Sequence, residues 1–167
     1  MRGQDVVYAN LAGDREPMAH TVVEAMKATG VRRLIWISSM GIYDEVPGET
    51  FGSILDPYRK SAKVIEESDL DYTILRPAWF TNADEIDYET TQKGEPFRGS
   101  VISRKSVAAL VVNLAQSPQL EVRRSLGLVR PRHGGKLVNL RIENQTEKLL
   151  EIVVRRIELR FEKREQC

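Results

Sequence analysis

Three short segments of the sequence carry small, hydroxyl-bearing and aromatic residues, the types that suit a ligand site. They are Asn10-Leu11-Ala12-Gly13, Ser38-Ser39 and Pro77-Ala78-Trp79-Phe80, and each follows a short apolar run. Ligands of open parallel sheets bind beyond the carboxyl ends of the strands, so we expect the three segments at one crevice. Small residues there let the backbone approach a flat ligand closely, although they equally suit a tight turn.

The polar and aromatic members of these segments each have two interpretations. Ser38 and Ser39 either bind a ligand or form hydrogen bonds with the backbone at the end of a strand. Trp79 and Phe80 either stack on a ligand ring or pack in the core, and packing is the commoner outcome for aromatic residues in loops.

Acidic, histidine and cysteine residues elsewhere do not predict a metal site or a pair of catalytic carboxylates. The scattered acids are expected to form a solvated rim; they are Glu45, Glu49, Asp84, Glu85, Asp87 and Glu89. His20 and His133 have no histidine or cysteine nearby in the sequence, so neither is expected to bind a metal ion. Cys167 is terminal, which predicts an exposed thiol without a catalytic role.

Short apolar runs predict buried strands near residues 5–10, 34–38 and 72–76. Helical patterns follow each of them, so strand and helix alternate along the chain. This order predicts an α/β protein with a parallel sheet and flanking helices, because parallel strands are covered on both faces.

Capping and turn residues mark the ends of the three expected helices. Pro17 suits the first position of one helix, and Gly30 suits its end in the left-handed conformation. Asp56-Pro57 predicts the start of the second helix, with the carboxylate as its cap, and Ser103 predicts the cap of the third.

Composition indicates one globular domain. The chain has 167 residues, of which 41% are hydrophobic and 29% charged, and its net charge of +1 does not predict a nucleic-acid partner. No apolar run approaches the ~18 residues of a membrane span, and no charged leader with a following apolar region opens the sequence. We therefore expect a cytoplasmic protein that has no membrane partner.

The sequence changes in character after Pro131, which divides it into a main domain over residues 1–131 and a tail over residues 132–167. In the tail, residues 137–142 partly alternate as a half-exposed strand would. An amphipathic helix is expected from the spacing of Leu150, Val153, Val154, Ile157 and Phe161. That helix either docks on its own domain or pairs with another copy.

Residues 3–131 resemble the atypical short-chain dehydrogenase/reductase superfamily, in its group of NAD(P)H-binding proteins similar to nitrogen-metabolite repressors. The resemblance rests on DVVYANLAG at 5–13, ISSMGIY at 37–43 and DYTILRP at 71–77. It implies the fourth, fifth and sixth strands of a Rossmann sheet, a nicotinamide dinucleotide (NADP or NAD) as partner, and a small carbonyl or quinone substrate. The cofactor-binding residues that it implies are Asn10, Leu11, Ala12, Gly13, Ser38, Lys63, Pro77, Trp79 and Phe80.

The sequence departs from that superfamily in its phosphate-binding part. Members begin with a strand and a Gly-x-x-Gly-x-x-Gly loop that binds the pyrophosphate, and no such motif occurs here. We therefore predict a truncated Rossmann domain that binds a dinucleotide weakly and leaves one edge of the strand at 5–10 unpaired. Either a second copy covers that edge as a homo-oligomer, or the strand at 137–142 does, or the domain is unstable.

The residues that match catalytic positions of the superfamily are Ser39, Tyr58 and Lys63. Its reductases use a Tyr-x-x-x-Lys pair, which a helix places ~40° apart on one face. Tyr58 and Lys63 are five residues apart, hence ~140°, so they cannot act together from a regular helix. Lys63 either holds a ribose alone or pairs with Glu66 or Glu67 at the surface, and Tyr58 is expected to pack or to cover the site.

The sequence is compatible with three functions. The first is an NAD(P)-binding oxidoreductase-like protein, impaired by the loss of the phosphate-binding loop. The second is a non-catalytic redox-sensing module, which the spacing of Tyr58 and Lys63 favours over the enzyme. The third is a truncated remnant whose tail makes protein contacts.

Overall fold

The computed structural model describes residues 1–132 and Val153, which form a mixed α/β domain. Its elements in chain order are β1 (Val6–Ala9), α1 (Arg15–Thr29), β2 (Arg33–Ile37), the 3-10 helix η1 (Gly52–Leu55), α2 (Asp56–Glu66), β3 (Asp71–Pro77), β4 (Trp79–Thr81), β5 (Glu89–Thr91), β6 (Val101–Ser103), α3 (Arg104–Gln116) and β7 (Arg124–Val129). The larger sheet has the order β1-β2-β3-β7-β5, and β4 pairs with β6 in a separate, smaller sheet.

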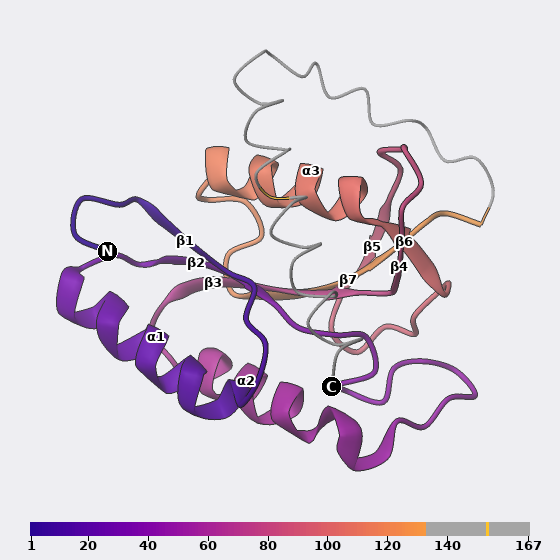
Figure 1. Ribbon diagram of the computed structural model, residues 1–167, viewed down its shortest axis with the longest axis horizontal. Helices are drawn as coiled ribbons and strands as arrows, with labels where there is room; N and C mark the ends of the chain where they lie inside the picture. Colours follow the sequence, from indigo (N-terminus) through magenta and orange to yellow (C-terminus); the bar gives the residue numbers. More distant parts are fainter. Residues whose placement is uncertain (133–152, 154–167) are drawn as a thin grey trace.

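The three strands expected from apolar runs lie side by side and run parallel, which confirms the predicted fold class. Leu34 of β2 is in register with Val7 of β1 and with Tyr72 of β3. β7 continues the parallel arrangement, and β5 closes it as an antiparallel edge strand. Helices α1 and α2 cover one face of this sheet and α3 covers the other (Figure 1).

Alternate residues of the central strands supply two hydrophobic cores, one on each face of the sheet. In β2, Leu34 and Trp36 pack with α1 and α2, whereas Ile35 and Ile37 pack with α3 and β7. All five residues of β2 are buried, as expected for a strand covered on both faces. A continuous apolar run therefore formed a central strand here, because both of its faces meet helices.

Four strands were not predicted from the sequence. β4, β5 and β6 have three residues each, and β5 is the polar sequence Glu-Thr-Thr, so none gives an apolar run. β7 is interrupted by Gly127, where a Cβ would overlap Thr91 and Phe97. That glycine is required by close packing, and it hides the strand pattern.

The helix boundaries confirm two of the expected caps and correct two. Gly30 ends α1 with a φ of +74°, and the Ser103 hydroxyl accepts from the Ser106 amide at 2.9 Å. α1 begins at Arg15, two residues before Pro17. The expected cap of α2 is wrong: Leu55 is the cap residue, since η1 leads directly into the helix, and the Asp56 carboxylate accepts from the Arg59 guanidinium at 3.1 Å.

The solvated rim expected from the acids is wrong for Glu45. Its side chain is 3% exposed and forms an ion pair with the fully buried Arg76. The Glu45 carboxylate also accepts from the backbone amides of Gly41 at 3.0 Å and Tyr43 at 2.9 Å. A loop carboxylate is buried here because it has these three donors.

The predicted tail falls mostly outside the described residues, including the strand at 137–142. Val153, which was expected on the apolar side of the helix, is helical and 9% exposed, and it belongs to the core on the α3 face. Within residues 1–132, β1 pairs with β2 alone and is therefore an edge strand. None of the described helices has the length and apolar character needed to cross a membrane.

Candidate ligand site

A cleft of about 450 Å³ opens beyond the carboxyl ends of β2 and β3. It brings together six of the residues singled out from the sequence, which are Ser38, Ser39, Tyr58, Pro77, Trp79 and Phe80. Ile54 and Leu55 of η1 and Pro57 in the first turn of α2 also line the cleft. Two of the three predicted segments therefore meet at one crevice.

Backbone hydrogen bonds hold the two segments together at the floor of the cleft. The Ser38 amide donates to the Leu75 carbonyl at 2.7 Å, and the Met40 amide donates to the Pro77 carbonyl at 3.3 Å. The chain beyond β3 is fixed in turn by the Ala78 amide, which donates to the Leu128 carbonyl at 2.9 Å. These bonds continue the pairing of the chain past the ends of β2 and β3.

Ser38 contributes a buried hydroxyl to this floor. The residue is 4% exposed, and its Oγ has no hydrogen-bond partner among the described residues. A buried hydroxyl without a partner costs free energy, about 1–3 kcal/mol in mutational data. A ligand that hydrogen-bonds to Ser38 Oγ would recover that cost.

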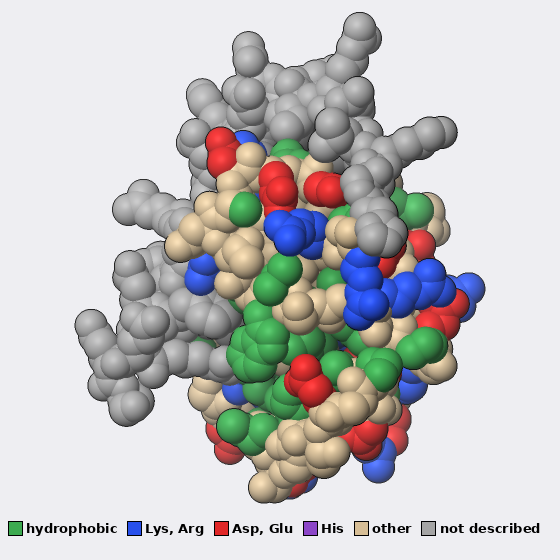
Figure 2. Space-filling model, turned by 90° about the vertical axis from the view of Figure 1, so that its right-hand side faces the viewer, with side chains coloured by type: hydrophobic (Ala, Val, Ile, Leu, Met, Phe, Trp, Pro, Cys, Tyr) green, Lys and Arg blue, Asp and Glu red, His purple; other side chains and the backbone are tan. Residues whose placement is uncertain are grey.

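Exposed hydrophobic side chains form the outer part of the cleft. Trp79 is 59% exposed and Ile54 is 75% exposed, and both line the cleft. Figure 2 views the end of the molecule toward which β2 and β3 run, and it shows hydrophobic side chains gathered near the centre of that face. A flat apolar ring has a surface to stack on at this end of the sheet.

Arg15 lines the cleft and was not singled out from the sequence. It is the first residue of α1 and is only 6% exposed. Its guanidinium lies 3.8 Å from the centre of the Tyr58 ring and donates to the Gly13 carbonyl at 3.1 Å. No sequence pattern indicates this contact, because it joins the start of α1 to the start of α2.

Two other groups of predicted residues lie elsewhere. Asn10, Leu11, Ala12 and Gly13 follow β1 and are not among the described residues that line the cleft. The Lys63 side chain is 74% exposed on α2, and its Nζ lies 3.8 Å from the Glu67 carboxylate. The structure thus places Tyr58 in the cleft and Lys63 outside its lining.

A polar network joins Tyr43, in the loop that follows β2, to the end of α2 and the start of β7. The Tyr43 hydroxyl donates to the Glu66 carboxylate at 2.6 Å and lies 3.3 Å from Ser125 Oγ. Burial, together with the bond to Glu66, raises the pKa of Tyr43 well above its ordinary value. Lys93 binds both oxygens of Glu66, at 2.7 and 2.9 Å, and lies over the Tyr43 ring.

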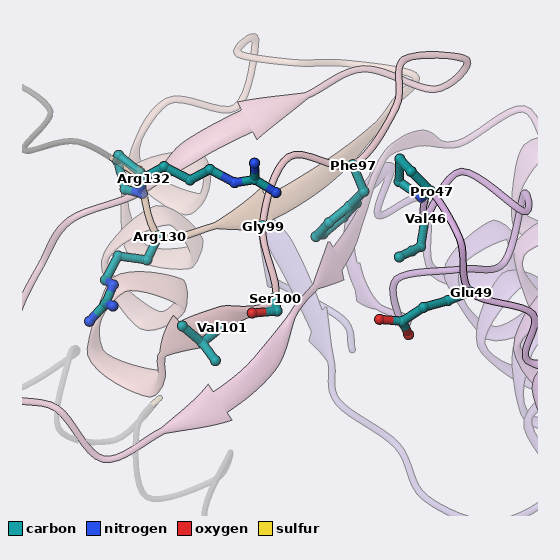
Figure 3. Close-up of a pocket in the computed structure, with 10 residues that line it drawn as sticks. Val46, Pro47, Glu49, Phe97, Gly99, Ser100, Val101, Arg130 and Arg132 are labelled. Atoms are coloured by element: carbon teal, nitrogen blue, oxygen red, sulfur yellow. The ribbon is translucent and has the colours of Figure 1, made fainter.

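A second hollow, of about 370 Å³, lies between the loop at 46–49 and the start of β6. Figure 3 shows Arg132 reaching across it toward Gly99, Glu49 on the opposite side, and Arg130 pointing away. Arg130 is 3.6 Å from the Glu85 carboxylate, which accounts for its direction. Within residues 1–132 and Val153, no cluster of histidine, cysteine or acidic side chains could hold a metal ion.

Comparison with known proteins identifies relatives for this architecture. Residues 1–118 match the model of a family described as NAD(P)H-binding, and no curated protein matches the sequence. A Rossmann-fold NAD(P)-binding family protein from Shigella flexneri is 46% identical, with a TM-score of 0.71 over 80% of this chain and 64% of its own. A short-chain dehydrogenase/reductase from Veillonella parvula, solved in complex with NADP, is 26% identical with a TM-score of 0.69, over 78% and 64% respectively. The chain therefore spans less than two thirds of the length of these structures.

Proposed function

Because the chain belongs to the family of NAD(P)H-binding proteins, we propose that its cleft receives the nicotinamide end of NADP or NAD. The observation that carries this proposal is the buried hydroxyl of Ser38, which lines a cleft at the carboxyl ends of two parallel strands. That place is where open α/β sheets bind their ligands. The protein is accordingly an NAD(P)-binding, oxidoreductase-like protein of the short-chain dehydrogenase/reductase type.

The residues of the cleft fit a nicotinamide ring. Trp79 and Phe80 offer aromatic surface to a flat ring, and Ser38 Oγ offers a hydrogen bond to its carboxamide. When bound, the nicotinamide supplies or accepts a hydride. Ser39, half-buried beside Ser38, would orient a small carbonyl or quinone substrate at the same floor.

Fewer observations support binding of the phosphate end of the cofactor. The sequence contains no Gly-x-x-Gly-x-x-Gly loop, and residues 10–13 are not among those that line the cleft, although Gly13 accepts a hydrogen bond from Arg15. We infer that the chain is similar to the nitrogen-metabolite-repressor group, and that these residues by themselves bind a dinucleotide weakly. Affinity would then depend mainly on contacts with the nicotinamide half.

A non-catalytic, redox-sensing role is the second candidate, and the position of Lys63 favours it. A reductase of this type needs a lysine beside the tyrosine to lower its pKa, and Lys63 is instead exposed and paired with Glu67. Tyr58 in the cleft would cover the bound ring and not transfer a proton. The protein would then bind the reduced or oxidised cofactor without turning it over.

Calorimetric titration of NADPH and NADP into the full chain tests the proposal. We expect weak, saturable binding that Ser38→Ala weakens, whereas Ser53→Ala, an exposed serine of η1 outside the lining, leaves it unchanged. Absence of heat and of a thermal shift at millimolar cofactor would refute it. Turnover with a panel of carbonyls and quinones separates the two candidates, since the sensing role predicts binding without NADPH oxidation.

The second edge of β1, which pairs with no described strand, supports one proposal about partners. Val6–Ala9 pairs with β2 on one side only among the described strands, and an unpaired edge invites a further strand. We propose that a second copy of the chain covers it as a homo-oligomer. Light scattering on the full chain decides this, and a monomer at all concentrations would contradict it.

A further inference from the structure

Arg15 places a positive charge in the proposed nicotinamide cleft, where the sequence predicted none. The residue is 6% exposed, so its guanidinium is largely removed from solvent. Its guanidinium carbon lies over the Tyr58 ring, 3.8 Å from the ring centre, and the guanidinium donates to the Gly13 carbonyl at 3.1 Å. These two contacts hold the guanidinium in place. A fixed, desolvated guanidinium is the group that proteins use to bind carboxylate and phosphate.

The start of α1 reinforces this charge. Arg15 begins a helix of 15 residues, and the Asp14 side chain before it makes no capping hydrogen bond. The amides of a first helical turn and the helix dipole both favour a negative group at this end. Glu16 in the same turn lies 3.5 Å from Lys60, so its charge is balanced by a neighbour.

Ser38 supplies an independent sign of a polar ligand. Its hydroxyl is buried, lines the same cleft, and has no partner among the described residues. The hydroxyl and the guanidinium therefore offer hydrogen-bond donors to one volume that otherwise has aromatic and aliphatic walls, including Trp79 and Leu55. This combination suits a flat ring that carries an oxyanion.

We propose that the cleft selects ligands with an anionic oxygen group attached to a flat ring, and that Arg15 binds that group. The inference deepens the proposed function, since it concerns the same cleft. A carboxylate would belong to the substrate, and a phosphate would belong to the cofactor. Arg15 is thus a specificity-determining residue of this protein.

Three small probes with one ring test the proposal, namely benzoate, phenyl phosphate and the neutral benzamide. Binding is followed by tryptophan fluorescence, because Trp79 is exposed in the cleft and Trp36, the second tryptophan, is fully buried. We expect at least one anionic probe to bind roughly ten- to a hundredfold more tightly than benzamide at pH 7. Preference for benzoate assigns the group to a substrate, and preference for phenyl phosphate assigns it to the cofactor.

Variants then tie the preference to Arg15. We expect Arg15→Gln to abolish the preference and leave benzamide binding unchanged, and Arg15→Lys to retain part of it. Arg32→Gln is the matched control, because Arg32 is exposed and paired with Asp69 and Asp71 away from the cleft lining. Thermal unfolding checks that each variant folds. If Arg15→Gln does not fold, the ratio of the affinities for the anionic probe and for benzamide is compared between the wild type and Arg15→Lys, and an equal ratio would contradict the role of Arg15.

Equal affinity for benzoate, phenyl phosphate and benzamide would overturn the inference, as would an oxyanion preference that survives in Arg15→Gln. A separate NADPH titration distinguishes its failure from that of the proposed function. If NADPH binds and the preference is absent, only the inference fails. If the preference depends on Arg15 and NADPH does not bind, the cleft takes anionic ligands and the proposed function fails.

Discussion

Arg76 and Glu45 form an ion pair in the interior, which links the end of β3 to the loop that follows β2. The Arg76 side chain is fully buried, and its guanidinium also donates to the hydroxyl and the carbonyl of Ser125 at 3.1 and 3.2 Å. Glu45 in turn accepts from two backbone amides of its own loop. The pair and its hydrogen bonds therefore join β3, β7 and the loop that follows β2.

We expect Glu45→Gln to destabilise the domain by about 3–5 kcal/mol, because it leaves the buried guanidinium without a compensating charge. Glu49→Gln is the control; it changes an exposed glutamate in the same loop and should alter the free energy of unfolding by less than about 0.5 kcal/mol. Urea unfolding of the full chain measures both. Equal losses for the two variants would show that the ion pair does not support the loop.

This ion pair also shows what the sequence could and could not predict. Apolar runs near 5–10, 34–38 and 72–76 predicted the parallel core correctly, since burial on both faces leaves a local pattern. Glu45 and Arg76 are 31 residues apart, and nothing near either one indicates the other. Glu45 therefore resembled the solvated acids around it.

The same distinction applies to the cleft. Ser38, Tyr58 and Trp79 could be singled out because strand ends and a helix start can be located from local sequence. Arg15 could not, because its place depends on the packing of α1 beside α2, which brings it over the Tyr58 ring. Likewise, β5 and β7 pair with strands far along the chain, so short or glycine-containing segments became strands without a local signal.

The raised pKa of Tyr43 predicts that the domain loses stability at high pH. Its folded-state pKa is raised from the ordinary value of 10.0, first by burial and then by Glu66, so the folded chain keeps this proton when the unfolded chain releases it. The stabilisation is complete below about pH 10 and is lost as the pH rises above it. We expect Tyr43→Phe to flatten this decline, and part of it will persist because the pKa values of Tyr72 and Tyr88 are raised in the same direction.

Unfolding in urea between pH 8 and 11 measures the effect, with ultraviolet absorbance reporting tyrosinate formation. At neutral pH the variant should lose about 1 kcal/mol with the bond to Glu66. An unchanged slope of stability against pH in Tyr43→Phe would contradict the assignment of the raised pKa to this residue.

Gly41 is expected to be intolerant of any side chain. Its φ is +83°, and a Cβ there would overlap the Phe51 ring, which packs against both cores. Gly48→Ala is a matched control in the same loop, because Gly48 has a φ of +78° but open space around it. We expect a loss of roughly 1 kcal/mol for Gly48→Ala from the backbone alone, and a clearly larger loss, about 2–4 kcal/mol, for Gly41→Ala.

Thermal and urea unfolding compare the two alanine variants directly. Because Gly41 also donates its amide to Glu45, Gly41→Ala should weaken the buried ion pair as well. Similar losses of stability for both variants would show that the loop rearranges to make room for the added methyl group, and that overlap with Phe51 adds no cost.

Substitution of Lys63 tests whether this lysine contacts the cofactor although it lies on another side of α2 than Tyr58. Since its side chain is 74% exposed and lies near Glu67, we expect Lys63→Met to leave the affinity for NADPH unchanged and to cost less than about 0.5 kcal/mol in stability. Calorimetric titration of the variant measures this. A marked loss of affinity would contradict this expectation and support the ribose contact that the family resemblance implies.

Substitution of Trp79 is expected to weaken ligand binding with little effect on stability. Its side chain is 59% exposed in the cleft, so Trp79→Ala removes little buried area from the folded chain. If a nicotinamide ring stacks there, the affinity for NADPH should fall roughly tenfold while the free energy of unfolding changes by less than about 1 kcal/mol. Leu120→Ala is the control, because Leu120 is also exposed, at 40%, but lies outside the cleft lining. Equal affinities of Trp79→Ala and Leu120→Ala for NADPH would show that Trp79 does not contact the cofactor. The proposed site would then rest on Ser38 alone.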